Sequence, residues 1–231
     1  MAQESARSFV KYTFYKTDPE WRRLPSADRD RSREELCAVV EEFASRMSIR
    51  SYSLMATRGD VDFMLWKISP SLEMLESLAA QVNRTEMGRY LRVPHSYLAM
   101  TRRSPYVDRH RHEGQEGASE TMRAIGRDYL FVYPFVKTHD WYQLPKGERQ
   151  RMMEEHFQVG HRYPSVKIST SYSFGLDDQE FVLGFETDSP SDFLDLVMAL
   201  RESAARPYTL RDIPIFTCLH KPLRECLDGL G

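Results

Sequence analysis

The sequence contains two copies of one unit, offset by 120 residues. Residues 21–25 read Trp-Arg-Arg-Leu-Pro, and residues 141–145 read Trp-Tyr-Gln-Leu-Pro. The same offset relates Ser69-Pro70 to Ser189-Pro190. Because the matches are spread over the whole unit, they indicate duplication rather than coincidence. The fold must therefore be one that a chain of this length can form twice.

Both copies predict the same order of elements: strand, helix, strand, strand, helix and a fourth strand. Apolar and β-branched runs mark the strands, and apolar residues three and four apart mark the helices. The first copy has predicted strands at 9–15, 49–56, 61–68 and 97–101, with helix stripes Leu36, Val39, Val40, Phe43 and Leu72, Leu75, Leu78. The second copy has predicted strands at 129–135, 166–174, 181–186 and 213–217, with helix stripes Met152, Met153, His156, Val159 and Phe193, Leu196, Val197, Leu200. This order is the split βαβ, or ferredoxin-like, motif.

Local signals predict where the helices begin and end. Ser69-Pro70 and Ser189-Pro190 suit helix starts, with serine as the cap and proline in the first position. Gly160 suits the C-terminal cap of the helix that carries His156.

The predicted fold is α+β, with duplicated ferredoxin-like units that form a dimeric α+β barrel within one chain. We expect an N-terminal unit over 1–103 and a C-terminal unit over 128–231. A polar segment rich in charge and glycine, 104–127, is predicted to connect them.

Composition narrows the class of protein. Of 231 residues, 41% are hydrophobic and 29% charged, the net charge is -2, and the pI is about 6.4. These values give no reason to expect a nucleic-acid partner. The apolar runs are far shorter than the roughly 20 residues of a membrane span. The first residues do not resemble a signal peptide, and three cysteines without metal-type spacing suit a reducing compartment, so we expect a cytoplasmic protein.

The two copies differ at one core position that bears on chemistry. His156 stands on the apolar stripe where the first copy has Leu36. A buried imidazole needs a bonding partner, which could be another side chain of the core or a metal. No second ligand stands at zinc-like spacing on that face, so a cage of side chains is disfavoured, whereas haem iron needs a single axial histidine.

Tyr133 and Lys137 lie four residues apart in a predicted strand and so share a face. One interpretation is a strand edge at Pro134 with a surface lysine. The other is a redox-active or proton-donating tyrosine beside a lysine that binds a carboxylate. The 25 arginines, against seven lysines, reflect either codon usage or carboxylate binding by planar guanidinium groups.

Five segments together resemble the chlorite dismutase superfamily, and within it the coprohaem decarboxylases, which are peroxide-dependent haem synthases. The resemblance covers nearly the whole chain, with the segments in family order. They are residues 11–25, residues 85–91 (Thr-Glu-Met-Gly-Arg-Tyr-Leu), Tyr133-Pro-Phe-Val-Lys137, residues 173–181 (Ser-Phe-Gly-Leu-Asp-Asp-Gln-Glu-Phe) and residues 208–216 (Tyr-Thr-Leu-Arg-Asp-Ile-Pro-Ile-Phe).

The resemblance implies a function and a role for each matched residue. It implies conversion of iron coproporphyrin III to haem b by hydrogen peroxide, in a homopentamer that binds porphyrin in the second unit. His156 matches the axial iron ligand, and Tyr133 matches the tyrosine that is oxidised near a propionate. Lys137 and Trp141 match residues beside a second propionate, and Arg201 matches an arginine that holds one.

One position departs from the chlorite-degrading members of the superfamily. Ser169 stands thirteen residues after His156, where chlorite dismutases carry arginine. Serine supplies no fixed positive charge, so chlorite dismutation is disfavoured. The sequence does not identify the group that assists the activation of peroxide. The alternatives are a haem-binding peroxidase or chlorite dismutase-like protein, a haem sensor or carrier without turnover, and a scaffold that binds no porphyrin.

Overall fold

The chain forms two compact units. The computed structural model describes residues 7–106 and 122–231. The first unit runs to Met100 and also includes Thr217–Gly231, and the second unit is Thr101–Phe216.

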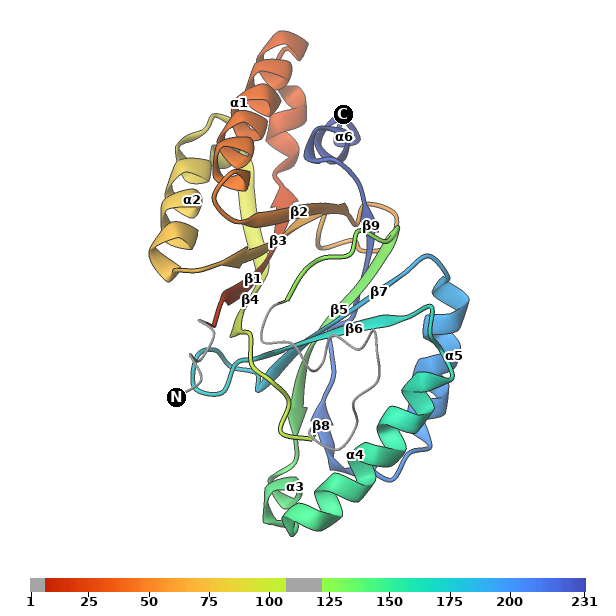
Figure 1. Ribbon diagram of the computed structural model, residues 1–231. Coiled ribbons are helices and arrows are strands. Elements are labelled where there is room, and N and C mark those ends of the chain that lie inside the picture. The colour runs from red at the N-terminus through yellow and green to blue at the C-terminus, as the bar shows by residue number, and fades with distance from the viewer. Residues whose placement is uncertain (1–6, 107–121) are drawn as a thin grey trace. The chain divides into compact units, whose positions relative to one another are not determined.

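The first unit is an antiparallel sheet with helices packed on one face (Figure 1). Its strands lie in the order β4-β1-β3-β2-β9, so its first four strands have the 4-1-3-2 arrangement of a ferredoxin-like unit. The elements are β1 (Phe9–Thr17), η1 (Pro19–Arg23), α1 (Ser26–Ala44), β2 (Ser48–Ser53), β3 (Phe63–Ser69), α2 (Leu72–Arg84), η2 (Met87–Tyr90), β4 (Leu91–Met100), β9 (Phe216–His220) and α6 (Leu223–Asp228).

The second unit repeats this plan, which confirms the duplicated α+β fold. Its strands pair in the order β6-β7-β5-β8, all antiparallel. The elements are β5 (Tyr129–Lys137), α3 (His139–Gln143), α4 (Lys146–His161), β6 (Lys167–Tyr172), β7 (Phe181–Thr187), α5 (Pro190–Arg201), η4 (Arg206–Tyr208) and β8 (Thr209–Arg211).

Strand register shows that the offset between the copies changes along the chain. Phe9 of β1 pairs with Ser69 of β3, and its counterpart Tyr129 of β5 pairs with Thr187 of β7. The two copies are therefore 120 residues apart at their first strands but 118 residues apart at their third strands. Ser69 and Ser189 are therefore not equivalent, and the predicted helix start at Ser69-Pro70 is wrong. The cap of α2 is Ser71, whose hydroxyl accepts a hydrogen bond from the Met74 backbone N–H. Ser189 does occupy the cap position of α5, with proline following.

Gly160 does not cap α4. The helix continues to His161, and Arg162 is its C-cap residue. Gly160 therefore lies inside the last turn of α4, where it lines the cavity described below.

The end of the chain also differs from the prediction. The fourth strand of the second unit is β8, at 209–211 rather than 213–217. Residues of β9 instead pair with β2, where His220 lies opposite Tyr52. The predicted boundary of 128–231 therefore places 217–231 in the wrong unit. This segment joins the first unit because Cys226, Leu227 and Leu230 are buried in its core.

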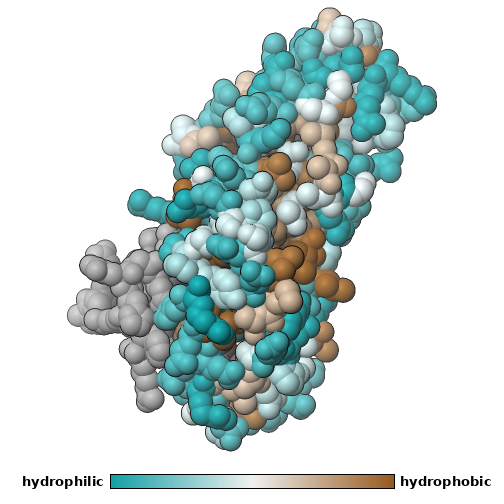
Figure 2. All heavy atoms as spheres, turned by 90° about the vertical axis from the view of Figure 1, so that its right-hand side faces the viewer, coloured by the Kyte–Doolittle hydropathy of each residue, from teal (hydrophilic) through white to brown (hydrophobic). Residues whose placement is uncertain are grey.

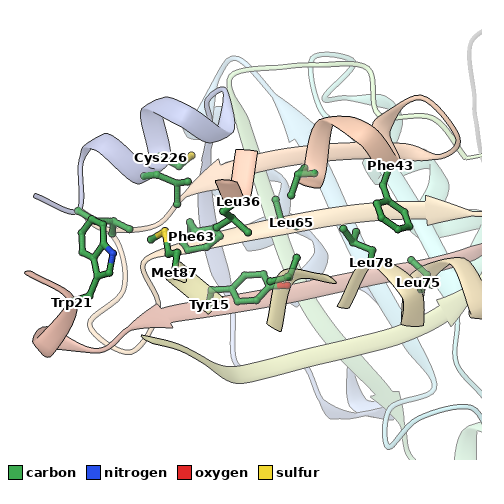
Figure 3. Packing of buried hydrophobic residues seen from close by; sticks show 14 of the residues in the cluster. Tyr15, Trp21, Leu36, Phe43, Phe63, Leu65, Leu75, Leu78, Met87 and Cys226 are labelled. Carbon is green, nitrogen blue, oxygen red and sulfur yellow. The ribbon is translucent and has the colours of Figure 1, made fainter. Parts of the chain in front are cut away.

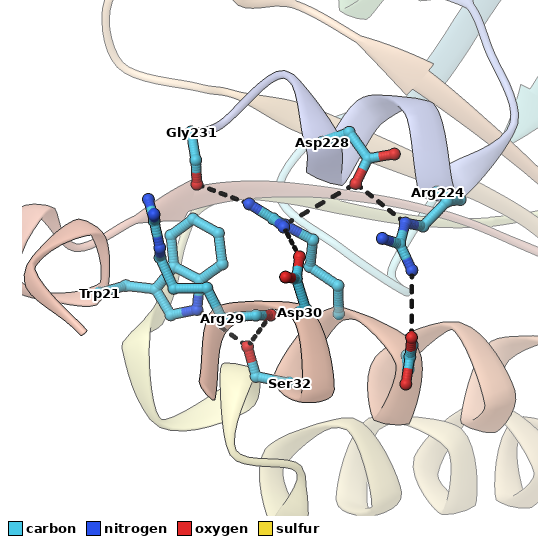
Figure 4. Close-up of polar contacts among 9 residues, drawn as sticks. Trp21, Arg29, Asp30, Ser32, Arg224, Asp228 and Gly231 are labelled. Atoms are coloured by element: carbon cyan, nitrogen blue, oxygen red, sulfur yellow. Dashed lines mark hydrogen bonds and ion pairs between the residues drawn. The ribbon is translucent and has the colours of Figure 1, made fainter. Parts of the chain in front are cut away.

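That core is large and closely filled. Residues of α1, α2 and α6 pack on one another and on the sheet, with Leu36 only 1% exposed at its centre (Figure 3). Trp21 is fully buried, and its indole N–H donates to the Ser32 hydroxyl at 3.0 Å. Arg33 donates to the Gly231 backbone oxygen at 2.6 Å, which ties the end of the chain to α1 (Figure 4).

The second unit has two smaller clusters of buried apolar residues. Phe131, Tyr133 and Phe185 belong to one cluster, and Trp141 and Met152 to the other. Of the predicted connecting loop 104–127, residues 107–121 lie outside the described part of the chain. The described part after them is held by Glu186, a buried carboxylate that accepts hydrogen bonds from the backbone N–H groups of residues 125 and 126.

Hydrophilic side chains cover most of the face shown in Figure 2, which includes the side of α5. Leu194 and Met198 of α5 are exceptions, with more than half of each exposed. Among the described helices, none combines the length and the apolar character needed to cross a bilayer. The three cysteines are all free thiols.

The packing of the first unit predicts the cost of emptying its centre. Replacing Leu36 with alanine should lower the free energy of unfolding by about 3 kcal/mol, because a closely filled core cannot collapse onto the lost volume. Leu72→Ala is the matched control. This leucine is 45% exposed, so its loss should change stability by less than about 0.5 kcal/mol. Urea unfolding of both variants measures the difference, and equal losses would contradict the assignment of Leu36 to the core.

Candidate functional site

A cavity of about 820 Å³ lies within the second unit. Residues of β5, β6 and β7 line it, together with residues of α4 and α5. The structure brings all six residues singled out from the sequence to its wall: Tyr133, Lys137, Trp141, His156, Ser169 and Arg201. Cavities of this volume commonly bind cofactors or substrates.

The wall of the cavity is apolar with a positively charged part. Its apolar side chains include Phe135, Phe181, Leu183, Phe185, Leu196 and Leu200. Among the described residues, six Lys or Arg side chains line it, against the single carboxylate of Asp212: Arg102, Lys137, Arg149, Lys167, Arg201 and Arg206. This excess of cations favours a large apolar ligand that carries several negative charges.

The cavity exists because α4 lacks the bulk that α1 has on its matching face. Where α1 buries Leu36 and Val40, α4 has His156 and Gly160. A Cβ atom added at Gly160 would meet no other atom within 4 Å. The space beside Gly160 is therefore open and forms part of the cavity.

His156 is partly buried at the wall of this cavity. Burial, together with the nearby Lys137 ammonium, lowers the pKa of its imidazole to about 4. Above that pH the ring is neutral and can offer a nitrogen lone pair. Among the described residues none is hydrogen-bonded to it, so that part of the chain supplies no bonding partner for His156.

Tyr133 projects from β5 into the same cavity. It is 8% exposed and its ring stacks on Phe185 with the centroids 5.7 Å apart. Burial raises the pKa of the phenol well above its ordinary value, and the carboxylate of Asp212 adds to the shift. The phenol is therefore protonated at neutral pH and retains a hydrogen that it can give up.

Lys137 and Trp141 form a contact at another part of the wall. The Lys137 ammonium lies 4.2 Å from the centre of the Trp141 ring, a cation–π distance. Burial lowers the pKa of Lys137 to about 8, Glu180 opposes this shift, and Arg206 adds to it. The backbone N–H of Lys137 donates to Glu180 at 2.8 Å, which fixes the end of β5. Lys137 is therefore a half-desolvated cation rather than a surface lysine.

Arg201 is paired within the protein. Asp212 accepts hydrogen bonds from Arg201 and, at 2.6 Å, from Arg206. These two arginines hold the pKa of Asp212 below its ordinary value, although burial opposes them. Arg206 and Asp212 were not selected from the sequence, and spacing alone could not have found them, because a 3-10 turn and β8 bring them to Arg201.

Ser169 lies on β6 opposite Gly184 and is 7% exposed. Its hydroxyl is at the cavity wall but carries no charge. Any fixed positive charge near a ligand must come from the arginines and lysines listed above.

These residues fit an iron porphyrin that carries acid groups. The cavity offers a neutral imidazole with no protein partner, which is the form of histidine that binds a metal. Its apolar wall suits a macrocycle, and its cations suit carboxylates. Among the described residues no three His, Cys, Asp or Glu side chains gather as a metal cage, so iron held here would need ligands from the porphyrin itself.

Comparison with known proteins agrees with this fit. The family model named chlorite dismutase matches residues 29–221. A coprohaem decarboxylase of Mycolicibacterium smegmatis is 33% identical over 167 residues, covering 72% of this chain and 70% of that protein. A chlorite dismutase of Ideonella dechloratans is 24% identical over 208 residues, which cover 88% and 72% of the two chains.

Solved structures agree as well. A variant of the chlorite dismutase of Candidatus Nitrospira defluvii matches with a TM-score of 0.88 and 26% identity, over 98% of this chain and 96% of that chain. The match of the family model and the match of the fold extend over both units. This chain belongs to the chlorite dismutase family.

Proposed function

We propose that this protein is a coprohaem decarboxylase, which converts iron coproporphyrin III to haem b. Two propionate side chains each lose carbon dioxide and a β-hydrogen and become vinyl groups. For each propionate, one hydrogen peroxide is reduced to two water molecules. When bound, the iron porphyrin supplies the redox chemistry with peroxide, and the protein positions and orients the propionates.

The observation that carries the proposal is the imidazole of His156. It lies without a protein partner on the wall of an apolar, cation-rich cavity, at the position where the other copy has a buried leucine. In that setting the neutral imidazole can offer a nitrogen lone pair to a metal. In this proposal the imidazole of His156 would hold the porphyrin iron.

Lys137, Trp141 and Arg201 have positioning roles in this proposal. The Lys137 ammonium binds a propionate and Trp141 packs beside it. Arg201 holds another propionate with the guanidinium N–H groups that Asp212 does not use, since a guanidinium has five donors. Because Asp212 already fixes Arg201 and Arg206, their guanidinium groups are oriented before the substrate binds.

Tyr133 is the catalytic residue in this proposal. Its raised pKa keeps the proton on the phenol, so oxidation removes a hydrogen atom rather than an electron alone. The oxidised Tyr133 then takes the β-hydrogen of a propionate held beside it. The propionate gives up one more electron to the second oxidising equivalent of the peroxide, its carboxylate leaves as carbon dioxide, and Tyr133 is restored.

Ser169 favours this reaction over chlorite dismutation, because serine cannot stabilise an oxychlorine anion as an arginine does. Hydrogen peroxide as oxidant, a homopentameric assembly and a cytoplasmic location stay predictions that accompany the proposal.

Tyr133→Phe tests the catalytic role. The variant should bind coprohaem as the parent protein does, because the phenyl ring keeps the stacking on Phe185, yet haem b should not form when peroxide is added. Mass spectrometry of the porphyrin detects each loss of carbon dioxide. The control is Tyr163→Phe, which removes another hydroxyl from the cavity wall and should leave turnover intact. Normal haem b production by Tyr133→Phe would exclude the assigned role.

His156→Ala tests the iron ligand. Loss of a direct ligand should weaken coprohaem binding by about 100-fold or more, beyond the 10–100-fold typical of outer partners. Added imidazole should enter the space left by the side chain and restore the Soret spectrum. His161→Ala, at the other histidine of the wall, should keep the parent spectrum. An unchanged spectrum in His156→Ala would contradict the proposal.

The pKa of Lys137 predicts how binding depends on pH. Its ammonium has a pKa of about 8 in the free protein, and a bound carboxylate would raise that value. Affinity for coprohaem should therefore be full below pH 8 and fall between pH 8 and the higher pKa of the complex. Arginine stays charged over this range, so Lys137→Arg should abolish the decline. A spectral titration from pH 6 to 10 measures it, and an identical decline in both proteins would assign it to another group.

A further inference from the structure

Arg149 is a cation of the cavity wall whose side chain has no hydrogen-bond or ion-pair partner within the described part of the chain. It stands on the same face of α4 as His156, seven residues before it, and lines the cavity with Trp141. Its Nε atom is buried and makes no hydrogen bond. Among the described residues, no carboxylate forms an ion pair with it. A guanidinium in this state needs an oxygen from somewhere else.

The first unit shows what such a helix face binds. The position that matches Arg149 is Arg29, which lies over Trp21 as part of a stripe with Arg33 (Figure 4). There the end of the chain supplies main-chain oxygens to Arg33 and Arg22, whereas the buried Nε of Arg29 itself makes no hydrogen bond. Arg33 donates to the oxygen of Gly231 at 2.6 Å, and Arg22 donates to that of Leu230 at 3.1 Å.

The second unit has the same stripe without the covering segment, because 217–231 packs in the first unit. At the position of Arg33 it has Met153, and at that of Leu36 it has His156, so Arg149 is the cation that the stripe retains. The nearby Glu180 is already used by the hydroxyl of Tyr142 at 2.7 Å and by the backbone N–H of Lys137. The ligand of the cavity is thus the available source of an oxygen for Arg149.

We propose that Arg149 binds a carboxylate of the porphyrin at the part of the cavity wall formed by Trp141. This inference rests on the proposed function, since it takes the ligand to be coprohaem. Lys137 lies over this indole and lines the same cavity as Arg149, so the wall offers two cations to the acid groups of a porphyrin. Arg149 is a positioning residue here, and its effect is on the affinity and orientation of the substrate.

Titration of the Soret band with coprohaem tests this role in three variants. Arg149→Gln should weaken coprohaem binding about tenfold. Arg149→Lys should bind coprohaem within about threefold of the parent protein, since lysine restores the positive charge but not the paired N–H donors of a guanidinium. Arg151→Gln removes the same charge from an exposed neighbour on α4 and should leave the affinity unchanged. High salt should reduce the difference between Arg149→Gln and the parent protein, because the contact is ionic.

The ligand-free melting temperature separates this role from a structural one. Arg149 has no protein partner, so Arg149→Gln should melt within about 2 °C of the parent protein. If the parent binds coprohaem and Arg149→Gln binds it equally well, the inference fails and the proposed function stands. If affinity falls together with melting temperature and Arg149→Lys restores neither, Arg149 is structural and the inference fails. If the parent protein itself takes up no coprohaem, the proposed function fails.

Discussion

The site of the second unit depends on a neutral imidazole at the wall of an apolar, positively charged cavity. On α4, His156 faces a cavity and finds no hydrogen-bonding partner among the described residues, while burial keeps it neutral. A ligand that filled the cavity and bonded to this nitrogen would stabilise the folded protein by mass action.

The duplication provides an internal comparison of how a core becomes a site. Both units pack a tryptophan at the start of the first helix, Trp21 and Trp141, and both bury it almost completely. The first unit then fills the helix face with Leu36 and Val40 and covers it with α6. The second unit has a histidine and a glycine at those positions, and the covering segment is absent from it. These differences lie where the first unit has a packed face and the second unit has a cavity wall.

The cations of the cavity wall outnumber the acids that could pair with them among the described residues. Arg201 and Arg206 share Asp212, which holds their side chains in place at the cost of one negative charge. Lys137 lies over an indole, and Arg149 has no acid at all. The wall therefore keeps a net positive charge, and a ligand with several carboxylates removes more repulsion than one with few. This is the physical reason to expect a preference for a porphyrin with four acid groups.

The sequence alone determined the duplication, the order of the elements and the residues with distinctive chemistry. The Trp-x-x-Leu-Pro repeat fixed the alignment of α1 with α4, and that alignment identified His156 as a polar residue on an apolar stripe. These features are local or periodic, so they can be recognised without the fold. Motifs in family order then indicated Tyr133, Lys137, Trp141, Ser169 and Arg201, which the structure brings to one cavity.

The tertiary structure alone decided what depends on contacts between distant segments. The offset between the copies falls from 120 to 118 by the third strand, which moved the start of α2 from Ser69 to Ser71. The last fifteen residues joined the first unit because the first core buries their apolar side chains. Arg149 and Asp212 became part of the site because space and charge at a cavity wall are properties of several elements together. No periodicity within one segment encodes them.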